Sequence, residues 1–351
     1  MGGLAGSVLL GAAALLGVTQ VAAQAPLAHP AVIRSEFIYT GAPIPSAHAS
    51  TIADTPQGLV AAWFGGSREG ADDVAIWLSR LVGGEWTAPV PVATGAQPDG
   101  RRFPCWNPVL APWPDGTLRL FYKVGPSPAR WWGMWIASRD GGQSWGPATR
   151  LPEGILGPVK NKPVQLASGV ILSGSSTETA DPDSRWRVHF ERSADSGRSW
   201  SVVTPAPPNG PELDAIQPAI LVHSAHRLQA LGRTRSGYIF ESWSLDEGKH
   251  WGPLTLTRFP NPNAGIDAVT LRDGRHLLVY NNTRQGRTPL NLALSPDGRA
   301  WTGILELETE PGEYSYPAVI QARDGMVHIT YTWNRNRIMH VVLDPAQLPP
   351  R

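Results

Sequence analysis

The sequence predicts an all-β chain folded as a six-bladed β-propeller, with four antiparallel strands in each blade. Two repeats predict it: a polar turn that recurs along the chain, and a strand-turn-strand unit that occurs six times. The composition agrees, because the 351 residues include 37 Gly, 34 Pro and 15 Trp, and only 17% are charged. This mixture suits short strands and tight turns better than long helices.

The recurring turn has the pattern Ser-x-Asp-x-Gly-x-x-Trp. It occurs as SRDGGQSW from Ser138, SADSGRSW from Ser193 and SLDEGKHW from Ser244, with a shorter copy, SPDGRAW, from Ser295 and a degenerate one, SRLVGGEW, from Ser79. The successive starts are 59, 55, 51 and 51 residues apart, a spacing that indicates a repeat architecture. We expect the aspartate to accept hydrogen bonds from the turn and the tryptophan to pack between neighbouring blades.

The second repeat is a pair of apolar strands joined by a polar turn. After each of the first five pairs come a third strand, the Ser-Asp-Gly-Trp turn and a fourth strand, which together make one blade. Residues 31–40 and 339–345 are further strands, and we expect them to complete one blade from both ends and remove an open edge. The six pairs begin at His48, Cys105, Lys160, Ile216, Gly265 and Tyr314.

A single propeller domain is therefore expected over residues 26–349. The alternative, a β-sandwich with a second domain, does not predict two interleaved repeats. Residues 1–23 are predicted to be a signal peptide, because a short apolar run, 8–21, precedes small residues, although no basic residue comes before it. This predicts a periplasmic or secreted protein, and no other segment is apolar enough to span a membrane.

Charge and cysteine content exclude several classes of function. The chain has 30 basic and 29 acidic residues, so nothing favours nucleic acid or an anionic membrane as a partner. Cys105 is the only cysteine, which rules out an intrachain disulfide and a cysteine-based zinc site. No metal-ligand spacing and no phosphate-binding glycine motif occur. We expect a monomer without metal, cofactor, nucleic-acid partner or stable membrane insertion.

Candidate site residues follow from the propeller geometry. The first strand of each blade lines the central channel, so the starts of first strands and the ends of second strands meet at one mouth. Four residues at these places are candidates for catalysis: His48, Asp72, Asp73 and Tyr314. The candidates for substrate binding are Arg68, Trp106, Asn107, Lys160, Lys162, Gln217, Arg233, Arg235, Asp267 and Arg287.

The repeated Ser-Asp-Gly-Trp turns, known as Asp boxes, resemble those of the sialidase superfamily over nearly the whole mature chain. The resemblance implies a secreted exo-glycosidase of the exo-α-sialidase type, which removes a terminal acidic sugar with an arginine triad, a tyrosine nucleophile and an aspartate acid/base. By this resemblance, Tyr314 in EYSYPAVI is the nucleophile and Asp72 or Asp73 is the acid/base. Arg287, with Arg235 or Arg233, supplies two members of the triad.

Two places depart from the family pattern. Sialidases open the first strand with Arg-Ile-Pro, whereas this chain has His48-Ala49-Ser50. The family's glutamate is also absent, because DAIQPAIL has Ala215 and Ile216 at that place, and Glu178 or Glu241 could substitute for it.

The departures predict a rebuilt carboxylate pocket. Two arginines and His48 would line it with added charge from Lys160 and Lys162, so the expected substrate is a glycan or oligosaccharide that carries a carboxylate. Two alternatives stay open. One is a uronate lyase that uses His48 and Tyr314 as its proton-transfer pair, and the other is a non-catalytic glycan-binding propeller.

Overall fold

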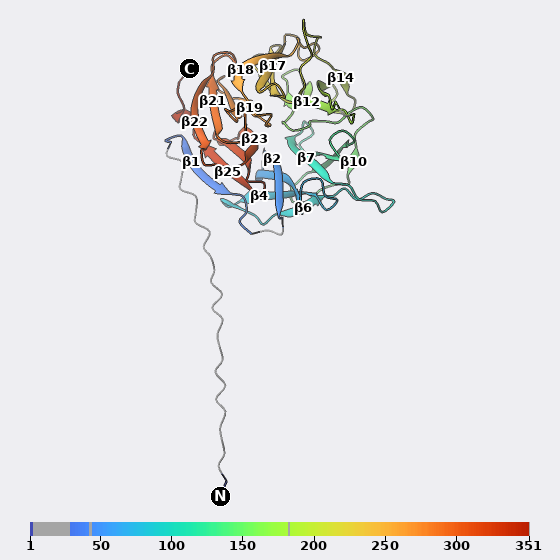
Figure 1. Ribbon diagram of the computed structural model, residues 1–351, viewed down its shortest axis with the longest axis vertical. Helices are drawn as coiled ribbons and strands as arrows, with labels where there is room; N and C mark the ends of the chain where they lie inside the picture. The colour runs from blue at the N-terminus through green and yellow to red at the C-terminus, as the bar shows by residue number, and fades with distance from the viewer. Residues whose placement is uncertain (3–28, 42–43, 182, 351) are drawn as a thin grey trace.

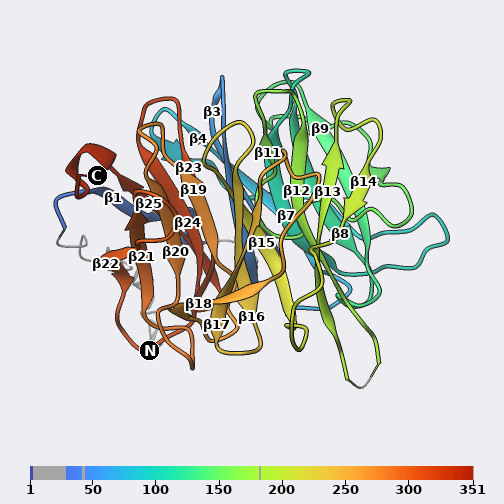
Figure 2. The same cartoon turned by 90° about the horizontal axis from the view of Figure 1, so that it is seen from above.

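The structure is a computed structural model that describes residues 1–2, 29–41, 44–181 and 183–350. The described residues form six antiparallel sheets that follow one another in chain order around a central axis (Figure 1). The side view shows the strands of the blades running along this axis (Figure 2). The prediction of an all-β, six-bladed propeller is confirmed. The predicted signal peptide, residues 1–23, lies outside the described residues except for the first two.

Five blades begin with their innermost strand and end with their outermost one. Blade 1 contains β2 (Ser46–Thr55), β3 (Gly58–Gly66) and β4 (Ala75–Val82), with β5 (Glu85–Trp86) and β6 (Val90–Ala93) both paired to β4. Blade 2 contains β7 (Cys105–Pro112), β8 (Leu118–Val124), β9 (Trp132–Ser138) and β10 (Thr149–Arg150). Blade 3 contains β11 (Val164–Gln165), β12 (Ile171–Glu178), β13 (Trp186–Ser193) and β14 (Ser201–Val203). Blade 4 contains β15 (Ala215–Val222), β16 (Leu228–Thr234), β17 (Tyr238–Ser244) and β18 (Thr255–Pro260), and blade 5 contains β19 (Asp267–Thr270), β20 (His276–Tyr280), β21 (Leu290–Ser295) and β22 (Thr302–Glu308).

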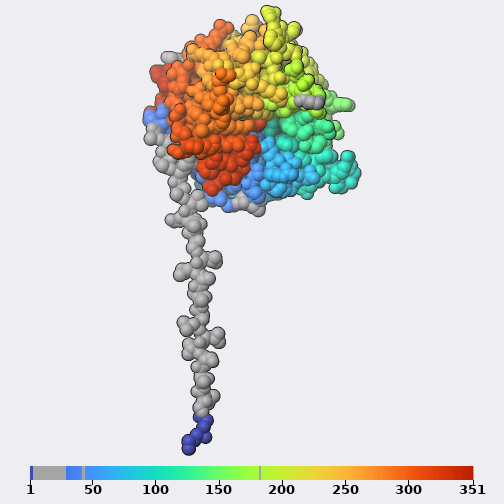
Figure 3. All heavy atoms as spheres, in the orientation of Figure 1, coloured from blue at the N-terminus to red at the C-terminus, as the bar shows by residue number. Residues whose placement is uncertain are grey.

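Blade 6 is completed by both ends of the domain. Its strands are β23 (Tyr314–Gln321), β24 (Val327–Trp333), β25 (Arg337–Leu343) and, outermost, β1 (Val32–Phe37). Strands β1 and β25 pair antiparallel, with Ser35 opposite Val341, so the predicted closure is confirmed. On the surface, red spheres from the end of the chain accordingly lie beside blue spheres from the first strands of the domain (Figure 3). A short 3-10 helix (Pro345–Gln347) follows β25.

The Asp-box aspartates are engaged within their own turns. The Asp140 carboxylate accepts hydrogen bonds from the Ser138 hydroxyl at 2.8 Å and from the backbone of Gln143 and Ser144 at 3.0 and 2.9 Å. The Ser144 hydroxyl and these other donors hold the pKa of Asp140 below its usual range. Each such turn lies where a third strand ends, which is the same end as the first hairpin turn and opposite to the channel mouth described below. The turns are therefore structural.

The turns also join neighbouring blades, as the sequence predicts. Trp251, at the end of the blade 4 turn, stacks on Phe190 of blade 3 with ring centroids 3.9 Å apart. The Trp113 indole of blade 2 donates a hydrogen bond to the Ser196 carbonyl, in the turn of blade 3, at 2.9 Å. The buried hydrophobic clusters likewise draw on adjacent blades, so burial of apolar surface between blades holds the ring together. None of the described helices is long and apolar enough to cross a membrane.

Trp113→Phe tests this connection between blades. The variant keeps an aromatic ring against Phe121 but loses the hydrogen bond to Ser196. We expect the free energy of unfolding to fall by about 0.5–1.5 kcal/mol, the usual net contribution of one hydrogen bond. Urea denaturation measures this change, and an unchanged transition midpoint would show that the turn does not fasten blade 3 to blade 2.

A chain of polar groups, with two buried histidines at its centre, crosses blade 6 at the closure. His328 of β24 and His340 of β25 face each other with their Nδ1 and Nε2 atoms 3.0 Å apart. His340 Nδ1 lies 3.2 Å from the Glu36 carboxylate of β1, and His328 Nε2 lies 3.3 Å from Asp324. Burial is the main cause that lowers the pKa of both imidazoles, so the folded state holds them neutral below their ordinary pKa of 6.5.

This arrangement predicts that the protein loses stability in mild acid. Burial also lowers the pKa of His48 and His223, so below pH 6.5 the unfolded chain binds more protons than the folded one. The free energy of unfolding should therefore fall between pH 6.5 and 5, by up to about 1.4 kcal/mol per pH unit for each fully buried histidine. Urea titrations at several pH values measure how the free energy of unfolding changes with pH.

His340→Gln should make the free energy of unfolding depend less strongly on pH. His226→Gln, the same change at an exposed histidine, serves as the control. A slope that is flat in the unmodified protein between pH 6.5 and 5 would contradict the prediction.

Candidate functional site

Four innermost strands carry the same irregularity at the point where they enter the channel. The register shifts between His48 and Thr51, Trp106 and Val109, Ile216 and Ala219, and Ser315 and Ala318. Within each bulge one residue has a positive φ, which costs backbone energy for residues other than glycine and is concentrated at functional sites. These residues are Ala49 (57°), Asn107 (40°), Gln217 (60°) and Tyr316 (50°).

Tyr316 lies at the centre of a group of cations from three blades. Its hydroxyl accepts a hydrogen bond of 2.9 Å from an Nη2 of Arg233, on β16. The guanidinium carbons of Arg233 and Arg287 lie 5.4 and 5.8 Å from its ring centroid, and the Lys160 ammonium lies at 6.0 Å. These groups belong to blades 4 and 5 and to the segment that leads into blade 3. Tyr316 is therefore the tyrosine that contacts the basic cluster.

His48 lies beside the same tyrosine. The two ring centroids are 4.3 Å apart, and His48 Nδ1 is 3.1 Å from the Thr332 hydroxyl. Burial, followed by the charges of Arg335, Arg287, Arg233 and Lys160, holds the pKa of His48 well below its ordinary value. The imidazole is consequently neutral near pH 7, and it adds no positive charge to the cluster.

Glu313 fixes two arginines at this mouth. Its Oε1 accepts hydrogen bonds from Arg287 Nη1 at 3.2 Å and from Arg335 Nε at 2.7 Å. Arg335, in the turn between β24 and β25, also pairs with Glu69 of the loop after β3. A fixed pair of guanidinium groups is suited to bidentate recognition of a carboxylate. Arg335 thus brings a third arginine to the cluster formed by Arg233 and Arg287.

Tyr314, the tyrosine predicted to be the nucleophile, lies in a different environment. It is 2% exposed and packs within the hydrophobic cluster of blades 5 and 6, with its ring centroid 6.3 Å from that of Trp333. Burial, with the charges of Glu308 and Glu310, raises its pKa. Tyr314 helps the site indirectly, because its backbone N–H donates to the Arg287 carbonyl at 3.0 Å.

The two predicted lysines make contacts within the protein. The buried Lys160 ammonium donates to Asn161 at 2.8 Å, to the Ile266 carbonyl at 2.6 Å and to the Pro317 carbonyl. It therefore joins blades 3, 5 and 6 behind Tyr316, and burial lowers its pKa to about 7. Lys162 forms an ion pair of 2.9 Å with Asp267, whose carboxylate also accepts from the backbone of Val319. Lys162 and Asp267 thus connect blades rather than remain available to a ligand.

The loop between β3 and β4 carries three more predicted residues, Arg68, Asp72 and Asp73, all exposed. The Asp73 carboxylate accepts hydrogen bonds from the backbone and hydroxyl of Ser67, both at 2.9 Å, so it shapes the loop. Within the described part of the chain, the Asp72 carboxylate has no hydrogen bond or ion pair. The Glu69–Arg335 pair ties the same loop to the basic cluster.

The remaining predicted residues are spread around the channel. Trp106 is buried against Phe64 and Trp131, and its indole donates to the Gly125 carbonyl at 2.8 Å. Asn107 and Gln217 occupy equivalent bulge positions in blades 2 and 4. Gln217 Oε1 is a buried atom without a hydrogen-bond partner among the described residues, a state that usually indicates water or a ligand.

Arg235 contacts Trp186 and donates a hydrogen bond to the Ser184 hydroxyl at 3.2 Å. Its guanidinium carbon lies 4.1 Å from the centroid of the Trp186 ring, which Arg233 also contacts at 5.2 Å. Glu178 interacts with both arginines, and burial raises the pKa of its carboxyl group. Glu241, the other candidate for the missing glutamate, instead accepts from Gln229 and Trp243 at 2.9 and 3.1 Å within blade 4.

No role was predicted from the sequence for Tyr316, Glu313, Glu69 or Arg335, although Tyr316 and Glu69 lie at strand ends that face the channel mouth. The sequence did contain a signal for Tyr316. In three repeats the residue at the channel position is followed directly by proline, as Asn107-Pro108, Gln217-Pro218 and Tyr316-Pro317. Aligned on the proline, these repeats place Tyr316 and not Tyr314 at the channel position. Arg335 had no comparable signal, since it lies in a turn.

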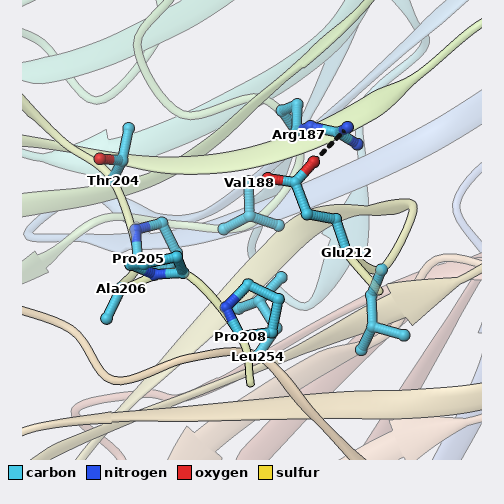
Figure 4. A pocket seen from close by; sticks show the side chains of 10 residues that line it. Arg187, Val188, Thr204, Pro205, Ala206, Pro208, Glu212 and Leu254 are labelled. Carbon is cyan, nitrogen blue, oxygen red and sulfur yellow. Dashed lines mark ion pairs between the residues drawn. The ribbon is translucent and has the colours of Figure 1, made fainter. Parts of the chain in front are cut away.

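A separate cavity of about 300 Å³ lies between the outer parts of blades 3 and 4. Pro205, Pro208 and Leu254 line it, and an ion pair of 2.5 Å between Arg187 and Glu212 closes one side (Figure 4). It contains none of the predicted site residues and is distinct from the basic cluster.

The fold and the Asp boxes together define a sialidase-like propeller. The family model of the BNR repeat-like domain matches residues 57–329, which is most of the chain. The chain belongs to this family of BNR repeat-like propellers. None of the curated protein sequences is a significant match.

Solved structures agree on the fold at low sequence identity. A protein of unknown function from Dyadobacter fermentans is 17% identical with a TM-score of 0.74, over 89% of this chain and 98% of that one. The NanB sialidase of Streptococcus pneumoniae is 13% identical with a TM-score of 0.70, over 93% and 72% of the two chains. The intramolecular trans-sialidase of Ruminococcus gnavus is 14% identical with a TM-score of 0.70, over 92% and 99%.

Proposed function

We propose that this protein is an exo-acting glycoside hydrolase that removes a terminal acidic sugar from a glycan. One observation carries the proposal: the Tyr316 hydroxyl is held at 2.9 Å by Arg233, in a cluster that also contains Arg287 and Arg335. Three guanidinium groups favour an anionic ligand, and a tyrosine among them provides a nucleophile next to the bound charge.

Each residue has a distinct role in this proposal. Arg287 and Arg335, fixed by Glu313, bind the sugar carboxylate. The Tyr316 oxygen attacks the anomeric carbon while its proton passes to the neutral imidazole of His48, whose ring centroid lies 4.3 Å from that of Tyr316. The hydrogen bond from Arg233 stabilises the negative charge that develops on the oxygen. Asp72 protonates the departing glycosidic oxygen, because its carboxylate is exposed while that of Asp73 is engaged by Ser67. Water then attacks the anomeric carbon and gives a proton to Asp72, and the departing Tyr316 oxygen takes its proton back from His48.

The first experiment identifies the class of substrate. The full chain is incubated with aryl glycosides and acidic oligosaccharides, both sialosides and uronides, and the products are identified by mass. Release of the terminal acidic sugar with gain of one water supports the proposal. Release of neutral sugars alone, or no turnover of any acidic glycoside, would reject it.

The His48–Tyr316 contact favours a second candidate, a uronate lyase. A neutral imidazole beside a tyrosine is suited to take the proton next to a uronate carboxylate while the tyrosine protonates the leaving oxygen. The product of elimination contains a new carbon–carbon double bond that absorbs ultraviolet light and gains no water. The same screen, followed in the ultraviolet, therefore separates the two reactions.

A further inference from the structure

A polar cavity of about 600 Å³ lies between blades 4 and 5. Arg235, Ser236 and Gly237 line it from the turn between β16 and β17, and residues 283–285 line it from the loop between β20 and β21. Both segments connect a second strand to a third strand. They therefore lie at the end of the propeller where the first strands begin, which is the end that carries the basic cluster.

Two arginines of this cavity are held in place by aromatic rings. Arg235 lies over Trp186 and also donates to the Ser184 hydroxyl at 3.2 Å. The guanidinium carbon of Arg284 lies 5.0 Å from the centroid of the Tyr238 ring. Arg284 also packs against Gly237. A Cβ added to Gly237 would lie 2.9 Å from the Nε atom of Arg284. Both guanidinium groups are thus positioned before any ligand binds.

The same arginines lack acidic partners. Within the described residues, neither Arg235 nor Arg284 forms an ion pair, although Glu178 lies near Arg235. Nearby Arg185 and Arg187, in contrast, both pair with Asp214, at 3.7 and 3.3 Å. The cavity therefore presents two guanidinium groups, and the side chains of Ser236 and Gln285 add neutral hydrogen-bond donors. This combination recognises an oxyanion. The Thr283 hydroxyl shapes the loop, because it donates to the Gln285 carbonyl at 2.9 Å.

The cavity adjoins the proposed catalytic cluster. Arg233, which binds Tyr316, and Arg235, which lines the cavity, both contact the ring of Trp186. We propose that the cavity is a second anion subsite, which binds an oxyanion on the sugar next to the terminal acidic sugar. The inference rests on the proposed function and narrows its substrate to glycans with acidic groups on two adjacent sugars.

The test compares two disaccharides that share a terminal acidic sugar and differ only in a sulfate ester on the second sugar. Isothermal titration calorimetry measures both affinities in the full chain that carries Tyr316→Phe, so that hydrolysis does not consume the ligand, and in the unmodified protein where no turnover is seen. We expect the sulfated disaccharide to bind about tenfold more tightly, because each hydrogen bond between charged groups, such as those from the two arginines to the sulfate, contributes about that factor to affinity. A third disaccharide, with a carboxylate in place of the sulfate, shows which oxyanion the subsite prefers.

The double variant Arg235→Gln/Arg284→Gln should bind the three disaccharides with similar affinity. Arg198→Gln, an exposed arginine in an Asp box at the opposite end, should keep the preference. Equal or undetectable binding of all three by the unmodified protein would overturn the subsite, and so would a preference that survives in the double variant. An intact preference without hydrolysis would reject only the proposed hydrolase, whereas hydrolysis without a preference would reject only the subsite.

Discussion

Tyr316→Phe should lower kcat for release of the acidic sugar by about a thousandfold, because it removes the oxygen that attacks the anomeric carbon. The hydroxyl accepts one hydrogen bond, from Arg233, so its loss should leave the ring packed between His48 and the arginines. Substrate affinity should change little. Steady-state kinetics on the substrate found in the screen, with a thermal melt of each variant, separates loss of chemistry from loss of folding.

Tyr314→Phe is the matched control, because it makes the same change two residues away. Tyr314 lies in the hydrophobic cluster, so this variant should keep at least half of the activity. Loss of activity in Tyr314→Phe, with full activity in Tyr316→Phe, would return the nucleophile to Tyr314. Full activity in both variants would exclude a tyrosine nucleophile altogether.

Arg287→Ala should reduce kcat/KM by roughly 10–100-fold, since a charge-assisted hydrogen bond contributes about 1.5–3 kcal/mol. The variant removes one of the two guanidinium groups that Glu313 holds, and it leaves Arg335 in place. Arg287→Lys should recover only part of the loss, because an ammonium keeps the charge but not the planar pair of donors.

Arg198→Ala, at the end of the propeller that carries the Asp boxes, controls for the loss of one positive charge. If Arg287→Ala and Arg198→Ala have the same kcat/KM as the unmodified protein, the arginine cluster does not bind the substrate carboxylate. A fall in kcat/KM that is equal in both variants would instead indicate only long-range attraction of the substrate.

The fold was predictable because its signals are local and repeated. Each Asp box is closed by hydrogen bonds within eight residues, as around Asp140, and the six strand pairs that alternate with the boxes give the number of blades. The closure of blade 6 was also predictable, because an unpaired strand remained at each end of the repeat series. Such features depend on the turn chemistry of a few neighbouring residues, which one sequence displays in full.

The site was predictable only as a region. The channel position placed His48, Arg233 and Arg287 near one another, but alternation along a strand could not choose between Tyr314 and Tyr316. A regular strand places residues two apart on the same face, and the bulge between Ser315 and Ala318 breaks that rule. Lys162 looked available for a substrate because its partner, Asp267, is 105 residues away in another blade.

The pairing of β1 with β25 also determines when, during synthesis of the protein, the proposed catalytic site can form. Glu36 and His340, which meet at this closure, are separated by 304 residues, so blade 6 forms only after the whole domain has left the ribosome. Blade 6 also holds Tyr316, which means that the proposed nucleophile reaches its position in the final step of assembly. A chain that stops before β25 would contain every proposed catalytic residue, Tyr316 included, and should still lack the proposed activity.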